Sequence, residues 1–327
     1  MTLPASLPES LRHLALAPDG RAWLTRLPDL VARATERWDL DLAAPFTGGS
    51  AGWTCLARHR DGDTRWPLVL KISFPHEEAA HEADALLHWQ GHGAPRLVDH
   101  DPDDWALLMR ALAPGTPLSA SSMTTERALR AGARVIAELH AAPVPAEGEF
   151  PTLEATIAWW GDLLHRRAEQ HTWAPTDAEL VAEWDRVAEE LTATPHRRVL
   201  LHGDANPGNV LASEEEGRLR WCAIDPKALV GDAAFDPWPL LEQVEPDPFD
   251  AADPAAELLE RASLVAPLLG TTARAIAGWS FVRRLESTLW LTDLVPRDAR
   301  TASSVEWLDL ARQWGETRVW HDAYRRV

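Results

Sequence analysis

The sequence predicts an α+β fold in two lobes, because strand-like and helical segments are unevenly distributed along its 327 residues. Up to about residue 113, short apolar runs alternate with Gly-rich turns, which indicates a small antiparallel sheet accompanied by a helix. Beyond that point the apolar residues recur mostly at helical spacing. We therefore expect an N-terminal lobe over residues 1–113 and a larger, mostly helical lobe over residues 114–327.

The N-terminal lobe is expected to begin with an amphipathic helix from Asp19 to Trp38, whose apolar residues recur every three or four positions. A Gly-rich turn over residues 46–54 follows. Two apolar runs then flank the turn Asp61-Gly62-Asp63, which predicts a β-hairpin. The remaining elements predicted for this lobe are strands at 53–58, 67–72, 96–98 and 105–110 and a helix over 77–90.

The second lobe is expected to start after Pro114-Gly115-Thr116-Pro117, a run of residues that favours a turn. Helical spacing dominates from there, interrupted by short strands and turns over residues 199–221. The helices predicted for this lobe cover residues 124–140, 156–170, 177–191, 255–290 and 304–324.

The chain is acidic, with 32 Lys and Arg against 50 Asp and Glu and a formal net charge of -18. This charge argues against a nucleic-acid partner, which needs a basic face for the phosphates, and against a surface drawn to anionic lipid. Two interpretations remain open. The acidic residues line a cleft for a cationic substrate, or they only keep the protein soluble.

The cysteines and the N-terminal segment indicate an intracellular protein. Neither Cys55 nor Cys222 lies in a Cys/His cluster, so no zinc site is expected, and two buried free thiols are favoured over a disulfide. No basic segment followed by an apolar run opens the chain, and no run of 18 apolar residues occurs. We expect a cytoplasmic monomer with no membrane partner.

The stretch from Val199 to Leu211 concentrates the groups that phosphoryl transfer needs. An apolar strand leads into a polar loop holding His202, Asp204 and Asn209, and Asp225 follows a later strand. A carboxylate beside an acceptor hydroxyl can orient it and take its proton. Amide and carboxylate oxygens are ligands that Mg²⁺ prefers. The alternative is a surface loop whose Asp and Asn side chains only make turn hydrogen bonds.

The spacing His-Gly-Asp-x-x-x-x-Asn, followed by Ile224-Asp225, resembles the catalytic loop and metal-binding Asp of the aminoglycoside-phosphotransferase and protein-kinase-like superfamily. The resemblance is greatest to streptomycin 6-phosphotransferases and the related aminoglycoside/hydroxyurea antibiotic resistance kinases, and it covers about residues 18–295. Further similar stretches are Gly20 to Trp23, Leu27-Pro28, Val98 to Asp101, Leu139-His140, Ile224 to Pro239 and Gly278 to Trp290.

This resemblance implies a two-lobed protein-kinase-like fold and an enzyme that moves the γ-phosphate of ATP to a hydroxyl of a small molecule. It places Asp204 and His202 in the catalytic loop, with Asp204 as the base and His202 as a structural residue that bonds backbone near Asp225. Asn209 and Asp225 would hold Mg²⁺ on the nucleotide phosphates. The loop departs from the family at Ala205 to Gly208, which leaves the identity of the acceptor open.

The resemblance also assigns nucleotide-binding residues in the first lobe. Lys71, a charge among apolar strand residues, would contact the phosphates and pair with a helix glutamate, either Glu82 or, failing that, Glu78. The Gly-rich turn, which is not a Walker A sequence, would face phosphates through its backbone N–H groups. The backbone from Met109 to Ala113 would contact adenine. The residues assigned in these two segments are Gly48, Gly49, Ser50, Met109 and Ala111.

The acceptor is expected to be an aminoglycoside such as streptomycin, and the acidic residues Glu242 and Glu245 are candidates to line its pocket. Two alternatives remain. The first is a metabolic kinase acting on an amino-sugar, nucleoside or amino-alcohol. The second is a nucleotide-binding regulator that has lost catalysis. A protein kinase is disfavoured, because neither Asp-Phe-Gly nor Ala-Pro-Glu occurs.

Overall fold

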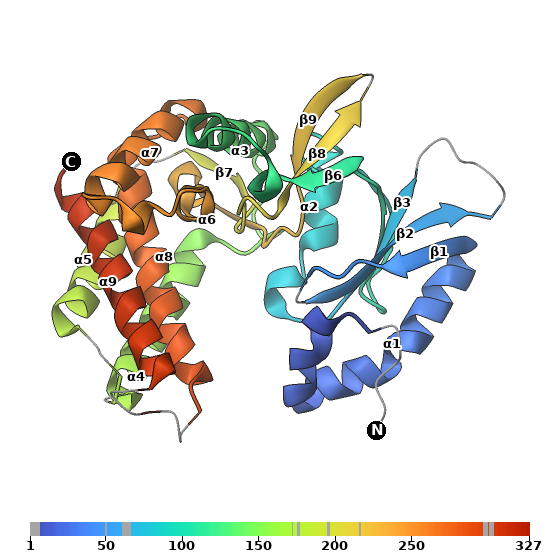
Figure 1. The fold of residues 1–327 in the computed structure, drawn as a ribbon, viewed down its shortest axis with the longest axis horizontal. Coiled ribbons are helices and arrows are strands. Elements are labelled where there is room, and N and C mark those ends of the chain that lie inside the picture. The colour runs from blue at the N-terminus through green and yellow to red at the C-terminus, as the bar shows by residue number, and fades with distance from the viewer. Residues whose placement is uncertain are drawn as a thin grey trace. The chain divides into compact units, whose positions relative to one another are not determined.

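The computed structural model of the protein describes residues 7–49, 51–60, 67–171, 173–174, 177–194, 197–215, 217–296, 300 and 304–327. The chain divides into two compact units (Figure 1). Unit 1 comprises Met1–Thr116 and Ala212–Lys227, and unit 2 comprises Pro117–Leu211 and Ala228–Val327. The first boundary lies three residues from the predicted one (116 against 113). The return of residues 212–227 to unit 1 was not predicted.

Unit 1 is built on a five-stranded antiparallel sheet in the order β1-β2-β3-β5-β4. The predicted hairpin is confirmed as β2 and β3, with Trp53 opposite Ile72 and Cys55 opposite Leu70. Its expected turn at 61–63 lies outside the described residues. The five strands are β1 (Leu40–Pro45), β2 (Gly52–His59), β3 (Leu68–Ser73), β4 (Leu97–Asp101) and β5 (Ala106–Arg110).

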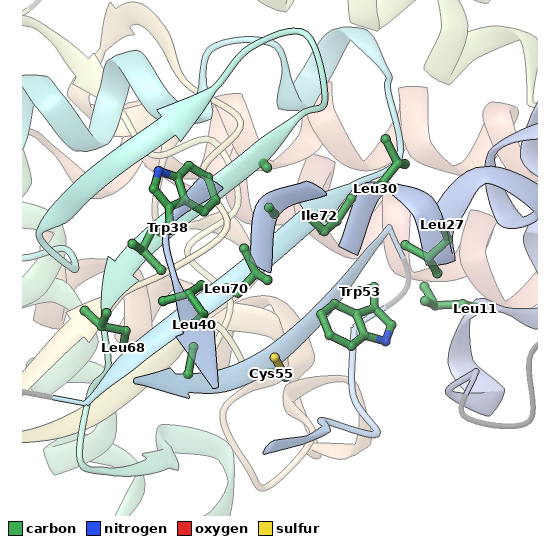
Figure 2. Packing of buried hydrophobic residues seen from close by; sticks show 14 of the residues in the cluster. Leu11, Leu27, Leu30, Trp38, Leu40, Trp53, Cys55, Leu68, Leu70 and Ile72 are labelled. Atoms are coloured by element: carbon green, nitrogen blue, oxygen red, sulfur yellow. The ribbon is translucent and has the colours of Figure 1, made fainter. Parts of the chain in front are cut away.

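One face of this sheet packs against the N-terminal helix α1 (Pro18–Arg37), which a short 3-10 helix η1 (Glu9–Leu16) precedes. Leu70 and Ile72 of β3 are fully buried in this core with Leu27 and Leu30 of α1 (Figure 2). Successive side chains of a strand point to opposite faces. The alternation therefore directs Lys71 to the face of the sheet that α1 does not cover.

The helix predicted over residues 77–90 is shorter than expected. The structure has a 3-10 turn η2 (Glu77–Ala79) and then α2 (Glu82–Trp89), which ends at Gln90 with φ 51°. The correction matters for the site, because it makes Glu82 the first residue of α2. An acidic side chain is stabilised at a helix N-terminus by the helix dipole.

The segment that returns to unit 1 forms a second sheet, in the order β6-β8-β9. The Glu214 amide donates to the Ala113 carbonyl and the Ala223 amide donates to the Gly93 carbonyl, each at 2.7 Å. These bonds are the physical reason that residues 212–227 belong with the first unit. The strands are β6 (Pro114–Pro117), β8 (Val210–Glu215) and β9 (Arg218–Ala223).

Unit 2 is mostly helical, as predicted, and α8 (Ala273–Leu294) lies at its centre, in contact with α4, α5, α7 and α9 (Figure 1). The stretch over 255–290 is helical, as expected, and it consists of two helices. Gly270 ends α7 at φ 65°, a conformation that favours glycine, and Thr272 then caps α8. The other helices are η3 (Leu118–Ala120), α3 (Thr125–Leu139), α4 (Leu153–Gln170), α5 (Ala178–Ala193), η4 (Ala233–Phe235), α6 (Trp238–Gln243), η5 (Pro248–Asp250), α7 (Pro254–Leu269) and α9 (Val305–Arg325).

Two short strands, β7 (Arg198–Leu201) and β10 (Leu229–Asp232), pair antiparallel within unit 2. The start of α4 lies against β10, since the Val230 amide donates to the Pro151 carbonyl at 2.8 Å. Gly231 permits this close approach, because a β-carbon added there would overlap the β-carbon of Leu153.

Two sequence expectations concern the whole chain. Cys55 and Cys222 are both buried thiols, as predicted. None of the described helices combines the length and the apolar composition needed to cross a lipid bilayer.

Replacing Gly231 with Ala is expected to lower the free energy of unfolding by about 1–3 kcal/mol, the usual range for overpacking a core. The neighbouring atom is a β-carbon, which no change of rotamer can move away. Gly315 in α9 is the matched control, because a β-carbon there meets nothing within 4 Å. Gly315→Ala should raise the unfolding free energy by about 0.5–1 kcal/mol. Denaturant unfolding measures both, and equal shifts in the two variants would contradict the packing argument.

Candidate active site

Lys71 is a buried cation on β3 that two carboxylates hold in place. Its Nζ donates to both oxygens of Glu82, at 2.6 and 2.7 Å, and to Oδ1 of Asp225 at 2.8 Å. The structure thus selects Glu82 over Glu78 as the partner of Lys71. Glu78 instead pairs with Lys227 at 2.9 Å, where both side chains are exposed.

The charge of Lys71 follows from these contacts. Burial alone would lower the pKa of Lys71, but the carboxylates of Asp225 and Glu82 outweigh it and raise that pKa above its usual value. Lys71 therefore stays protonated across the physiological range. A fixed positive charge on a rigid central strand is suited to contacting phosphate oxygens.

Asp225 follows β9 in the returning segment of unit 1. Its backbone has φ 59°, which is uncommon for a residue other than glycine but is tolerated best by Asn and Asp. Its side chain is 45% exposed while one oxygen contacts Lys71. The carboxylate is therefore both oriented and accessible to a ligand.

The Gly-rich turn between β1 and β2 includes Gly49 at φ 92°, where a larger residue would be strained. A β-carbon added at Gly52 would come within 3.2 Å of the Ile72 carbonyl oxygen, so glycine permits close pairing with β3. Gly48 has open space around its α-carbon, and Ser50 lies outside the described residues. Phosphate binding by this turn stays a prediction.

The segment expected to contact adenine is already hydrogen bonded in part. Met109 lies in β5 opposite Val69 of β3 and Leu97 of β4. The Ala111 amide donates to the Pro67 carbonyl at 2.9 Å. That amide would contact a nucleobase only by exchanging its present partner, so the role assigned to Met109 and Ala111 also stays a prediction.

The catalytic loop of unit 2 connects β7 to β8, and internal hydrogen bonds give it a defined shape. Nδ2 of Asn209 donates to the carbonyl of Asp204, five positions earlier, at 3.0 Å. Oδ1 of Asn206 accepts from the amides of Gly208 and Asn209. Asn206 is therefore the residue whose side chain closes this turn.

Asn206 also has a role that the sequence did not indicate. Its Nδ2 donates to Oδ1 of Asp204 at 3.1 Å, so the amide that shapes the turn also orients the carboxylate. The turn signal Asn206-Pro207-Gly208 located this residue, but nothing in that signal pointed to a contact with Asp204.

A buried carboxylate from outside the loop fixes its first two residues. Asp236 is fully buried and accepts from the amides of His202 at 2.8 Å and Gly203 at 2.7 Å, and from Nε2 of His140 at 2.7 Å. Burial alone would raise the pKa of Asp236, but the hydrogen bonds from His140 and the His202 amide lower it overall. Asp236 therefore fixes the start of this loop from outside it.

His202 is fully buried, and its Nδ1 accepts from the amide of Asp204 at 3.3 Å. This contact supports the prediction that His202 is a structural residue of the loop. One ring contact that the structure shows is with the Asp204 amide. The expected bond to backbone near Asp225 stays a prediction.

The side chains assigned to a metal have suitable chemistry. Asn209 commits its amide nitrogen to the Asp204 carbonyl, so its carbonyl oxygen is the atom it offers to a ligand. Asp225 offers a partly exposed carboxylate. Mg²⁺ is commonly held by one or two such protein oxygens together with nucleotide phosphates and water, so the residues present fit the ion.

Glu242 does not have the place that the acidic sequence run suggested. Its carboxylate is buried and accepts from Nε1 of Trp238 and Trp320, each at 2.6 Å, and from Arg284 at 2.5 Å. Burial raises the pKa of this carboxyl group. Glu242 thus joins α6 to α8 and α9 through donors that the protein itself supplies. Glu245 is exposed.

Comparison with known proteins agrees with this arrangement. The family model of aminoglycoside/hydroxyurea antibiotic resistance kinases matches residues 38–294. A streptomycin 6-kinase of Streptomyces glaucescens is 33% identical over 282 residues, which cover 84% of this chain and 86% of the relative. A streptomycin 6-kinase of Streptomyces griseus is 32% identical over 314 residues, 93% of this chain and 96% of the relative.

Among solved structures, choline kinase from Cryptosporidium parvum superposes with a TM-score of 0.61 over 90% of this chain and 95% of that one, at 12% identity. This likeness shows the fold and confirms the predicted α+β kinase-like class. The family match over most of the length identifies the chain: it belongs to the aminoglycoside/hydroxyurea antibiotic resistance kinase family.

Proposed function

We propose that this protein transfers the γ-phosphate of ATP to a hydroxyl group of an aminoglycoside of the streptomycin type. The observation that carries the proposal is the catalytic loop, in which Asp204 is held by Asn206, Asn209 and His202. Two relatives that match nearly full length are streptomycin 6-kinases. A loop that only made a turn would not need hydrogen bonds to the carboxylate, the carbonyl and the amide of one residue.

In the proposed reaction, Asp204 acts on the acceptor. Its carboxylate accepts a hydrogen bond from the acceptor hydroxyl and orients the oxygen toward the γ-phosphorus. As the new O–P bond forms, the bond from the γ-phosphorus to the bridging oxygen breaks and ADP leaves. The hydroxyl proton passes to Asp204. Asn206 keeps the carboxylate oriented during this transfer, since it donates to Oδ1.

The other assigned residues act on the nucleotide. Lys71 would donate to phosphate oxygens, and Glu82 would keep the ammonium in position. Asn209 and Asp225 would each offer an oxygen to Mg²⁺, which when bound neutralises negative charge on the phosphates. Gly48, Gly49 and Ser50 would present backbone N–H groups to the same phosphates.

The acceptor class follows from charge and from the family. A protein with a net charge of -18 attracts a cationic acceptor such as an aminoglycoside. Hydroxyurea is the second candidate, because the family model that matches the chain is described by both acceptors. Membership of this family does not favour a metabolic kinase. The four side chains Lys71, Asp204, Asn209 and Asp225 argue against a catalytically silent regulator, which has no use for the base.

The first test is turnover with ATP and Mg²⁺ across streptomycin, other aminoglycosides, amino-sugars and hydroxyurea. We expect turnover with streptomycin, lowered in Asp204→Asn by about 10²-fold or more because the base is lost. Asp322→Asn, an exposed change of the same chemistry on α9, is the control and should keep full activity. Turnover with an amino-sugar but no antibiotic would contradict the proposed acceptor, and an unimpaired Asp204→Asn would contradict the mechanism.

The second test separates the two glutamates near Lys71. Glu82→Gln should weaken ATP binding and destabilise unit 1, though by less than the ~3–5 kcal/mol of a fully orphaned buried ion, because Asp225 still contacts Lys71. Glu78→Gln removes only an exposed pair with Lys227 and should change stability by about 0–1 kcal/mol. KM for ATP and denaturant unfolding are measured for both variants. A larger effect of Glu78→Gln than of Glu82→Gln would refute the pairing of Lys71 with Glu82.

The third test concerns the anchor of the catalytic loop. Asp236→Asn replaces one acceptor oxygen with a donor that faces the amides or His140, which should destabilise the protein by about 1–3 kcal/mol and lower kcat. Asp232 is the matched control: it is also buried, but it caps η4 and accepts from Trp279 without contacting the loop. Asp232→Asn should lose stability and retain kcat per folded molecule. Equal kcat in the two variants would disprove the anchoring role.

A further inference from the structure

Arg283, on the central helix α8, reaches the residue that immediately precedes Asp204. One guanidinium nitrogen donates to the carbonyl of Gly203 at 2.8 Å, and the other donates to the carbonyl of Phe235 at 3.3 Å. No sequence pattern indicates this residue, because it lies 80 positions from Gly203 within a helix of ordinary composition.

The guanidinium is held by two aromatic rings. Its central carbon lies 4.3 Å from the ring centroid of Phe235 and 4.7 Å from that of Trp238. Phe235 is itself buried and packs edge-on against Trp279, with centroids 5.7 Å apart. Cation–π contacts with a fixed ring and a hydrogen bond on each terminal nitrogen leave Arg283 little freedom.

The rings that hold Arg283 flank Asp236 in the sequence Phe235-Asp236-Pro237-Trp238. Asp236 accepts from the N–H of Gly203, while Arg283 donates to the C=O of the same residue. Both polar groups of this one glycine are therefore fixed from outside the loop.

Gly203 is the residue for which such fixing matters most. It has φ 79°, in a region where glycine is free to move because it has no β-carbon. The Gly203 carbonyl belongs to the peptide that joins it to Asp204, so its orientation sets the direction in which the Asp204 side chain leaves the backbone. Asp236 fixes the preceding peptide, while His202 holds this second peptide at its N–H and Arg283 holds it at its carbonyl.

We propose that Arg283 is a positioning residue for Asp204: it fixes the Gly203–Asp204 peptide and thereby aims the carboxylate at the acceptor hydroxyl. This inference rests on the proposed role of Asp204 as the base. It predicts a defect in kcat rather than in nucleotide binding, because Arg283 acts only through the loop. It also predicts that lysine substitutes poorly, since one ammonium cannot reproduce two donors fixed in a plane.

The test uses Arg283→Gln and Arg283→Lys in the full chain, assayed with ATP, Mg²⁺ and the best acceptor of the panel. We expect kcat of Arg283→Gln to fall by about 10–10²-fold, as a misplaced catalytic group does, with KM for ATP unchanged. Arg283→Lys should recover part of the loss. Rates are divided by the folded fraction, so that a loss of stability alone does not count.

Arg274 provides the matched control on the same helix. Its guanidinium lies 4.2 Å from the ring centroid of Tyr324 and donates to the hydroxyl of Tyr324 at 2.7 Å, so it makes the same kinds of contact away from the catalytic loop. Arg274→Gln should reduce stability and leave kcat per folded molecule unchanged. If Arg283→Gln behaves like Arg274→Gln, Arg283 is only structural and the proposal is overturned.

A double variant tests whether Arg283 acts through Asp204. In the Asp204→Asn background the carboxylate is already lost, so adding Arg283→Gln should lower the residual rate no further. A second loss of the same size as in the wild-type background would show an independent effect and overturn the proposal.

Hydrogen exchange of residues 199–211 adds a measurement that needs no acceptor. Arg283→Gln should speed exchange in this segment, whereas Arg274→Gln should not. Unchanged exchange in Arg283→Gln overturns the positioning role whether or not the enzyme turns over. If the wild-type protein shows no turnover but exchange is faster in Arg283→Gln, the proposed function is refuted. The contact of Arg283 with the loop is then still supported.

Discussion

The arrangement of unit 2 depends on one buried carboxylate, that of Asp236. A buried ion is strongly unfavourable unless the protein supplies donors to replace water. Asp236 obtains them from His140 at the end of α3 and from the amides of His202 and Gly203. A shift of the catalytic loop would leave the ion with too few donors. The hydrogen bonds that Asp236 needs therefore also determine where the catalytic loop lies.

Unit 1 also contains a buried ion that needs partners from the protein, but there the ion is a cation. The buried ion is the ammonium of Lys71, and its partners are Glu82 at the start of α2 and Asp225 in the returning segment. The pairing ties a helix and a loop to the central strand of the sheet. In both units, then, the groups proposed to act on the reactants are located by a buried charge, which tolerates fewer arrangements than apolar packing does.

The sequence predicted the features that depend on local periodicity and missed those that depend on distant donors. The apolar runs located the hairpin that carries Lys71, and the loop motif located Asp204 and Asn209. The choice between Glu82 and Glu78 stayed open, because both lie in one acidic segment and only the start of α2 separates them. The contact of Arg283 with Gly203 spans 80 residues, and no local pattern marks a helical arginine whose donors reach a backbone carbonyl.

Burial also limits what the acidic composition can say about the acceptor. Three of the carboxylates in this chain, those of Glu82, Asp236 and Glu242, are consumed by lysine, histidine, arginine, indole or backbone donors inside the protein. They contribute to the net charge of -18 without offering an oxygen to a cationic substrate. The proposed recognition of an aminoglycoside would therefore depend on carboxylates that remain exposed, and an acidic run in the sequence does not identify them until burial is known.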